Sequence, residues 1–160
     1  MIGVLVISHE PLGTSLIHCT RHIFGHMLPQ LAALDVIPDE DTAEAIAAAQ
    51  ALCTRINDGS GVLVLTDVMG ATPSRIAAAL AIPHRIVVVA GVNLPLLVKA
   101  LTHRRGAELE ALVDQLLPAA REAIVTMLPG MFEPITATDT AKVEKVRKEP
   151  PSGAAEDKSS

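Results

Sequence analysis

The segment IGVLVISHEPLG at residues 2–13 decides the fold class, because a continuous apolar run leads into the start of a helix. Continuous runs of Val, Ile and Leu are typical of strands that are buried on both faces of a parallel sheet. Three further runs follow, LAALDV at residues 31–36, VLVLT at residues 62–66 and IVVVA at residues 86–90. We therefore predict strands at residues 2–7 and at these three positions.

Helical patterns alternate with the four runs. Helices are predicted at residues 11–26, 41–56 and 108–127, and two more start at Thr72-Pro73 and at Asn93. Strict alternation of strands and helices indicates an α/β fold with right-handed crossovers. We expect an open parallel four-stranded sheet in the order 2-1-3-4, with helices on both faces.

Details of two helices follow from their residues. Pro118 is expected to kink or split the last helix, since proline lacks the N–H that an interior turn needs. The first helix is expected to bury one stripe of apolar side chains. This stripe consists of Leu12, Leu16, Cys19 and Ile23.

The composition excludes several classes of function. The 160 residues fit one domain, and the 49% hydrophobic content excludes global disorder. A net charge of −5 and only two aromatic residues argue against nucleic-acid binding. The first apolar run is too short for a membrane helix or an export signal, so we expect a cytoplasmic protein without direct membrane insertion. Cys19 and Cys53 form no CxxC motif and are expected to be a buried, reduced pair.

The composition changes after residue 130, where charged and proline-rich segments replace the apolar pattern. We expect one domain at residues 1–130 and a polar, largely flexible tail at residues 131–160. Residues 132–137 could add one short edge strand, which Pro134 would restrict to an edge or an irregular pairing.

Polar residues follow the first and third strands, at the edge where open α/β sheets bind ligands. The expected strand order places His9 beside Asp67. A carboxylate that accepts the Nδ1 proton fixes the histidine tautomer and leaves Nε2 as a nucleophile. The helix that starts at Pro11 and the turn at residues 70–72 before the next helix add two positive helix ends, which suit a phosphoryl group. For each of these residues a local structural role, in a loop, a turn or a cap, is the alternative.

The source of the phosphoryl group is suggested by motifs that the sequence lacks. It contains no GxxxxGK[ST] motif, and no arrangement of Asp or Lys residues for holding magnesium is evident. We therefore expect another phosphoprotein, rather than bound ATP, to be the donor, and we expect neither a cofactor nor a metal. His18, His22 and His26 lie four residues apart on the first helix, but without further ligands they indicate a polar or partner-facing edge rather than a metal site.

Three segments carry a resemblance to a known family, namely VLVISHEPLG at residues 4–13, GVLVLTDVMGATPSRIAA at residues 61–78 and VAGVNLPLLVKAL at residues 89–101. Together they resemble the mannose-type enzyme IIA domain of the bacterial phosphoenolpyruvate-dependent sugar phosphotransferase system, over about residues 1–128. It implies a protein-histidine phosphotransferase that pairs as a homodimer, often by exchanging a C-terminal strand. It also implies that His9 accepts a phosphoryl group on Nε2 from the carrier protein HPr and passes it to an enzyme IIB partner. In the resemblance, Asp67 is the orienting carboxylate and Thr72 is the hydroxyl residue near the phosphoryl group.

The sequence departs from this family beside the histidine. The predicted phosphoryl-binding group consists of Glu10, Gly70, Ala71 and Thr72. Glu10 replaces a small or neutral residue, and its carboxylate would repel phosphate unless it points to solvent. Arg75 stands where many relatives have Asn, and it could pair with Glu10, with a phosphoryl group or with an acidic partner.

The sequence does not indicate which sugar the system would transport. It also leaves two other functions open. One is a free-standing regulatory module, in which the phosphorylation state of His9 controls partner binding. The other is a receiver-like domain that is phosphorylated on Asp67, which would need an acidic cluster after the first strand.

Overall fold

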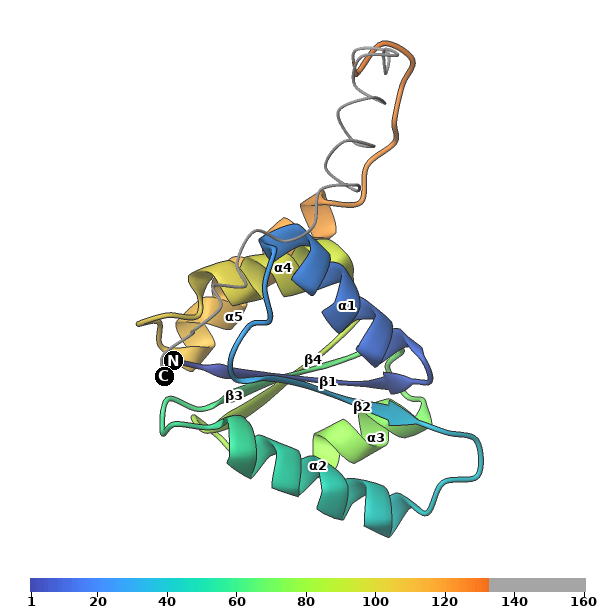
Figure 1. The fold of residues 1–160 in the computed structure, drawn as a ribbon, viewed down its shortest axis with the longest axis vertical. Helices are drawn as coiled ribbons and strands as arrows, with labels where there is room; N and C mark the ends of the chain where they lie inside the picture. Colours follow the sequence, from blue (N-terminus) through green and yellow to red (C-terminus); the bar gives the residue numbers. More distant parts are fainter. Residues whose placement is uncertain (133–160) are drawn as a thin grey trace, which may run out of the picture. The chain divides into compact units, whose positions relative to one another are not determined.

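The fold is known from a computed structural model that describes residues 1–132 (Figure 1). A compact unit comprises Met1–Ile124, and the chain from Val125 onward forms a second unit. The domain boundary expected at residue 130 stays a prediction. The polar tail lies outside the described residues except for its first two positions, and so does the short edge strand beyond its first residue.

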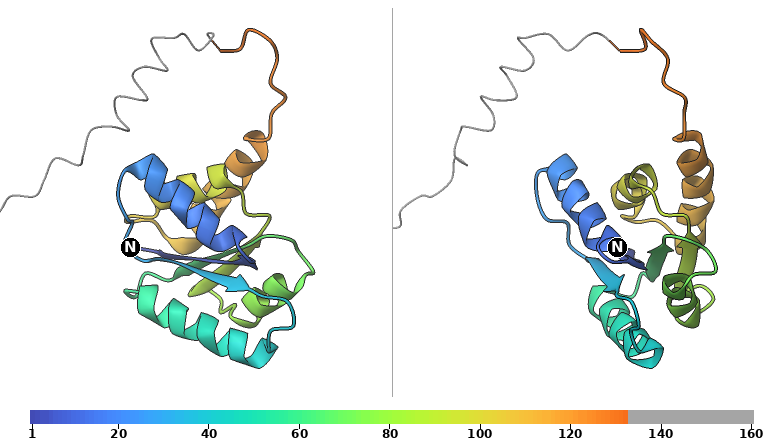
Figure 2. Two further views of the ribbon diagram at one scale, coloured as in Figure 1. Left: turned by 45° about the vertical axis from the view of Figure 1, so that its right-hand side comes forward. Right: turned by 90° about the vertical axis from the view of Figure 1, so that its right-hand side faces the viewer.

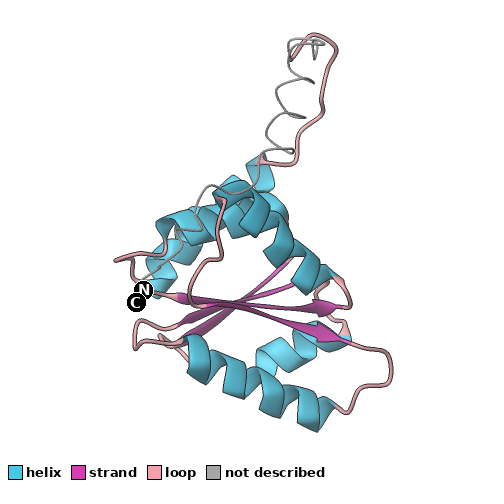
Figure 3. Cartoon of the chain, viewed as in Figure 1, coloured by secondary structure: helices cyan, strands magenta, loops and turns pink. Residues whose placement is uncertain are grey.

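The described residues form one parallel four-stranded sheet (Figure 3). Its strands are β1 (Gly3–His9), β2 (Leu31–Val36), β3 (Val62–Thr66) and β4 (Ile86–Ala90). They lie in the order β2-β1-β3-β4 and are all parallel, which confirms the predicted fold class and strand order. The two central strands, β1 and β3, therefore end side by side at one edge of the sheet.

Helices cover both faces of this sheet, as the views in Figures 1 and 2 show. On one face lie α1 (Leu12–Phe24), α4 (Leu94–His103) and α5 (Leu109–Glu122). On the other face lie α2 (Thr42–Ile56) and α3 (Thr72–Ala79). Alternate residues of β1 belong to the two hydrophobic clusters, and residues 2–7 are fully buried. The sheet is thus buried on both faces, as continuous apolar strands require.

The inner face of α1 differs from the predicted stripe. Leu16 is buried as expected, but Leu12, Cys19 and Ile23 are exposed, and the prediction that Cys19 is buried is therefore wrong. The residues that α1 buries are Gly13, Leu16 and Thr20. The helix is turned so that Gly13, which has no side chain, packs against the sheet. Cys53 is buried, as predicted, and burial raises the pKa of its thiol.

Two other helices also differ from their predictions. The last helix, α5, ends at Glu122 instead of residue 127, and it continues through Pro118 without being split. Leu116 and Ala120, on either side of Pro118, are both buried, and their packing holds this last turn in place. The start at Thr72-Pro73 was expected with Thr72 as the N-cap and Pro73 as the first helical residue, but Ala71 is the N-cap of α3 and Thr72 is already helical.

Arg104 is a buried residue that the sequence did not single out. It follows α4, and its side chain is almost completely buried. Its guanidinium donates hydrogen bonds to the carbonyl groups of Pro29 (2.6 Å), Gln30 (2.8 Å) and Ile2 (3.3 Å). Arg104 thereby ties the end of α4 to the segment before β2 and to the start of the chain.

Candidate functional site

A histidine and an aspartate meet where the two central strands end. His9 is the last residue of β1, and Asp67 directly follows β3. The Nδ1 atom of His9 lies 2.6 Å from Oδ2 of Asp67. The side chain of His9 is 56% exposed, whereas that of Asp67 is 9% exposed. The predicted proximity of the two side chains is therefore confirmed, with the ring open to solvent and the carboxylate mostly covered.

Both carboxylate oxygens of Asp67 accept hydrogen bonds. Oδ2 accepts from the backbone N–H of His9 at 3.0 Å, and Oδ1 accepts from the backbone N–H of Val68 at 2.8 Å. Burial works to raise the pKa of Asp67, but hydrogen bonds from the His9 backbone, the His9 ring and the Val68 backbone outweigh it and lower this pKa. Asp67 is thus held as a carboxylate, and the Nδ1–H tautomer of His9, which can donate to it, is favoured.

The backbone of Asp67 is held by the loop that follows β4. The N–H of Gly91 lies 2.9 Å from the carbonyl oxygen of Thr66 and 2.8 Å from that of Asp67. Gly91 has a φ of 89°, a left-handed conformation that a glycine adopts without strain. Asp67 is therefore held by hydrogen bonds from the end of β1 and from the loop after β4.

The predicted phosphoryl-binding residues are only partly brought to His9. Thr72 and Glu10 line a cavity of about 620 Å³ together with His9. Gly70 and Ala71 do not line it. The Gly70 N–H donates to Oγ of Ser74 at 2.8 Å, and the Ala71 N–H donates to the carbonyl of Val68 at 3.3 Å. Both amides thus have a hydrogen-bond partner in the turn or in the first turn of α3, and their role in phosphoryl binding stays a prediction.

At the start of α1, the N–H of Thr14 donates to the carboxylate of Asp35, at 3.1 Å from Oδ1. The expectation that the positive end of this helix faces a phosphoryl group stays a prediction. Asp35 belongs to β2 and was not recognised as a site residue. The signal for it was a lone acidic residue in the otherwise apolar run LAALDV.

The two charged departures from the family pattern stay apart. Glu10 and Arg75 are both exposed, and within residues 1–132 neither takes part in an ion pair. The Glu10 side chain therefore has no cationic partner among these residues, although it lines the same cavity as His9.

The three histidines do not share one helix, because α1 ends at Phe24 and His26 lies beyond it. His18 and His22 line one cavity together with Arg21, whereas Nδ1 of His26 lies 2.9 Å from the carbonyl oxygen of Phe24. Across residues 1–132, no three His, Cys, Asp or Glu side chains come together in a way that would hold a metal ion.

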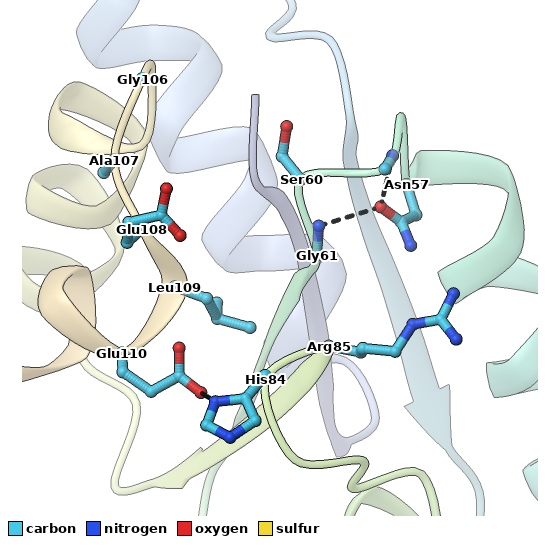
Figure 4. A pocket seen from close by; sticks show the side chains of 11 residues that line it. Asn57, Ser60, Gly61, His84, Arg85, Gly106, Ala107, Glu108, Leu109 and Glu110 are labelled. Atoms are coloured by element: carbon cyan, nitrogen blue, oxygen red, sulfur yellow. Dashed lines mark hydrogen bonds and ion pairs between the residues drawn. The ribbon is translucent and has the colours of Figure 1, made fainter.

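A second cavity, of about 430 Å³, lies at the opposite edge of the sheet (Figure 4). It opens beside Gly61 and Arg85, which directly precede β3 and β4. His84 and Glu110 point toward each other there, with Nδ1 2.7 Å from Oε1, and both side chains are well exposed. Because open α/β sheets bind ligands at the carboxyl ends of their strands, the His9 edge is the better candidate.

Comparison with known proteins was made for sequence and structure. Residues 3–117 match the family described as "PTS system fructose IIA component", where PTS stands for phosphotransferase system. No curated protein sequence matches significantly. In the described part of the chain, no helix is both long and apolar enough to cross a membrane.

Several solved structures are similar. The phosphotransferase system component EIIA from Streptococcus agalactiae is 27% identical with a TM-score of 0.71, over 79% of this chain and 97% of that one. The mannose/sorbose specific IIA subunit from Enterococcus faecalis is 22% identical with a TM-score of 0.70, over 82% and 98% of the two chains. The PTS IIA protein associated with the fucose utilization operon of Streptococcus pneumoniae is 23% identical with a TM-score of 0.65, over 78% and 91%. The last two structures are less than 25% identical to this chain, so their similarity shows a shared fold alone.

Proposed function

This chain belongs to the family of PTS fructose IIA components, and we propose that it carries a phosphoryl group on His9, which it accepts from phosphorylated HPr and passes to an enzyme IIB partner. Family membership makes it a component of a sugar phosphotransferase system, with phosphotransferase activity in general terms. The residue, the donor and the acceptor are what we propose. The observation that carries the proposal is the contact between the exposed ring of His9 and the buried carboxylate of Asp67.

The proposed transfer is an in-line displacement between two nitrogen atoms. The lone pair on Nε2 of His9 attacks the phosphorus of the donor phosphohistidine, and the P–N bond of the donor breaks as the new P–N bond forms. His9 keeps its Nδ1 proton, which Asp67 accepts in a hydrogen bond, so the ring becomes cationic beside a carboxylate. Thr72, on the same cavity, is the hydroxyl residue we place near the phosphoryl group. In a second displacement of the same kind, a nitrogen of the acceptor histidine attacks the phosphorus, and the P–N bond to His9 breaks as the new one forms.

The burial of Asp67 supports His9 as the acceptor over a receiver-like phosphorylation of Asp67. Both oxygens of Asp67 are hydrogen-bonded, and only 9% of its side chain is exposed. An attack by Asp67 on a phosphoryl group would break these hydrogen bonds and displace the His9 ring. Nε2 of His9 can react without any such rearrangement.

The surroundings of His9 support protein partners. Exposed apolar side chains lie on the segments that directly follow β1, β2 and β3. They are Leu12, Ile37, Val68 and Met69, the last of which is 84% exposed. Apolar groups gathered around a reactive residue are typical of surfaces that dock another protein. On the same proposal the chain acts in the cytoplasm, where HPr acts, and works as a homodimer, which light scattering of the purified protein tests.

The experiment is to incubate the protein with phosphoenolpyruvate, enzyme I and HPr, and to compare the native chain with two variants. We expect His9→Ala to abolish labelling. His84→Ala should be labelled like the native protein, because it removes the other histidine whose Nδ1 contacts a carboxylate. Full labelling of His9→Ala, or no labelling of the native chain, would contradict the proposal.

A further inference from the structure

The carboxylate of Asp35, a residue of β2, accepts a hydrogen bond from the first turn of α1. Asp35 lies in β2, directly opposite Ser8 of β1. Its oxygens Oδ1 and Oδ2 lie 3.1 and 3.4 Å from the backbone nitrogen of Thr14, which donates to them. Pro11, the N-cap residue of α1, has no polar side chain of its own. Asp35 therefore does from a neighbouring strand what a capping side chain does within a helix.

The packing around this contact leaves no spare room. A Cβ atom on Gly13 would lie 2.7 Å from Oδ1 of Asp35, 3.0 Å from Oγ of Ser8 and 3.3 Å from Cβ of Ala33. Any larger residue at Gly13 would push either the carboxylate or the helix away. Asp35 can thus reach the Thr14 amide because Gly13 has no side chain.

The segment that Asp35 restrains from one side carries His9. Only Glu10 and Pro11 separate the end of β1 from the start of α1. The N–H of His9 donates to Asp67 at 3.0 Å, and the N–H of Glu10 donates to the carbonyl of Val36 at 3.1 Å. With the Asp35 contact at Thr14, three hydrogen bonds hold the connection between β1 and α1, and two of their acceptors lie at the end of β2.

We propose that Asp35 is a positioning residue for His9. It touches neither the ring nor a phosphoryl group. It holds the first turn of α1 in the place that keeps Nδ1 of His9 against Asp67, and so keeps Nε2 as the free nitrogen. The inference rests on the proposed function where it concerns transfer, but its effect on the tautomer of His9 is measurable in the unmodified protein.

The test compares Asp35→Ala with Asp35→Asn in the full chain. The Asn side chain keeps an oxygen that can accept from Thr14, whereas Ala keeps none. Two readouts are needed, the rate of labelling by phosphorylated HPr and the ring ¹⁵N shifts of His9, which report its tautomer. We expect Asp35→Ala to slow labelling by about tenfold to a hundredfold and to move His9 from the Nδ1–H tautomer toward a mixture. Asp35→Asn should stay within about threefold of the native rate, because a retained hydrogen bond keeps the geometry.

Asn57→Ala is the control, since at the opposite edge of the sheet it removes a side-chain oxygen that accepts from the backbone N–H groups of Gly59 at 2.9 Å and Gly61 at 3.1 Å. It should lower the melting temperature without changing the tautomer of His9. If Asp35→Ala does not fold, Gly13→Ala displaces the same carboxylate and should produce the same tautomer change.

Either of two results overturns the inference. One is a folded Asp35→Ala or Gly13→Ala protein with the native tautomer and rate. The other is an Asp35→Asn protein as impaired as Asp35→Ala. A native chain that HPr does not label contradicts the proposed function alone, and the tautomer then decides the role of Asp35.

Discussion

The Nδ1 atom of His9 lies 2.6 Å from Oδ2 of Asp67, although the two residues are 58 positions apart in the sequence. The contact exists because β1 and β3 are adjacent and parallel, with Ile7 opposite Thr66. Each residue stands within one or two positions of that pair. The strand order therefore brings His9 and Asp67 together.

Asp67→Ala should slow the labelling of His9 by about tenfold to a hundredfold, because the loss of an orienting carboxylate typically reduces activity by this amount. The fold should persist, since β1 and β3 keep their pairing. Quench-flow labelling and circular dichroism check the two statements. Asp58→Ala is the control, as its carboxylate accepts from the N-terminal ammonium and from the backbone N–H of Ser60, and it has no hydrogen bond to His9. Equal rates for Asp67→Ala and the native protein would refute the orienting role.

Asp67 should also contribute to acid sensitivity. Its pKa is lowered in the folded protein despite burial, chiefly by hydrogen bonds from His9. A lowered folded-state pKa stabilises the protein above the unfolded-state value of about 3.9, and this stabilisation is lost as the pH falls through the folded-state value. The free energy of unfolding of the native protein should therefore fall more steeply below about pH 4 than that of Asp67→Asn. Urea titrations at several pH values test this, and parallel curves would count against it.

Thr66→Val should stabilise the protein by about 1 kcal/mol, because it removes a polar group that has lost its hydration. The Thr66 hydroxyl is fully buried and has no hydrogen-bond partner within residues 1–132. Thr20→Val is the matched control. The Thr20 hydroxyl is also buried but donates to the carbonyl of Ile17 at 2.8 Å, so its removal should destabilise. Urea unfolding measures both, and a destabilised Thr66→Val would show that this hydroxyl is satisfied.

Arg104→Met should destabilise the protein by about 2–4 kcal/mol, because it removes the buried charged donor that three buried or part-buried carbonyl groups share. Arg105→Met, at the exposed neighbouring position, should change stability by less than about 0.5 kcal/mol. Thermal and urea unfolding compare the two variants directly. Similar losses in both would mean that the three carbonyl contacts of Arg104 contribute little.

The sequence was sufficient for the sheet and for the dyad, since both depend on local signals. Continuous apolar runs marked the four strands, and their order placed His9 beside Asp67. The sequence pattern predicted the wrong buried face of α1, because packing against the sheet overrides hydrophobic periodicity there. The apolar stripe of Leu12, Cys19 and Ile23 faces outward because Gly13 takes the place against the sheet.

Asp35 and Arg104 could not be assigned from the sequence, because their partners are backbone groups that only the folded chain brings near. Asp35 binds an amide of another element, and Arg104 binds carbonyl groups more than 70 positions away. The lone acidic residue in the run LAALDV marks Asp35 as unusual, but it does not show which backbone group the carboxylate binds. The hydrogen bonds of the Gly70 and Ala71 amides could not be predicted either. They depend on the positions of the Ser74 hydroxyl and the Val68 carbonyl in the folded chain.

The central claim is that Asp67 holds the Nδ1 proton of His9 and leaves Nε2 to carry the phosphoryl group. The most direct measurement is ³¹P and ¹⁵N NMR of the protein labelled by phosphoenolpyruvate, enzyme I and HPr, with the modified atom assigned. We predict a single acid-labile, base-stable phosphohistidine at Nε2 of His9. A phosphoryl group on Nδ1 of His9, or a base-labile one on Asp67, would contradict the account.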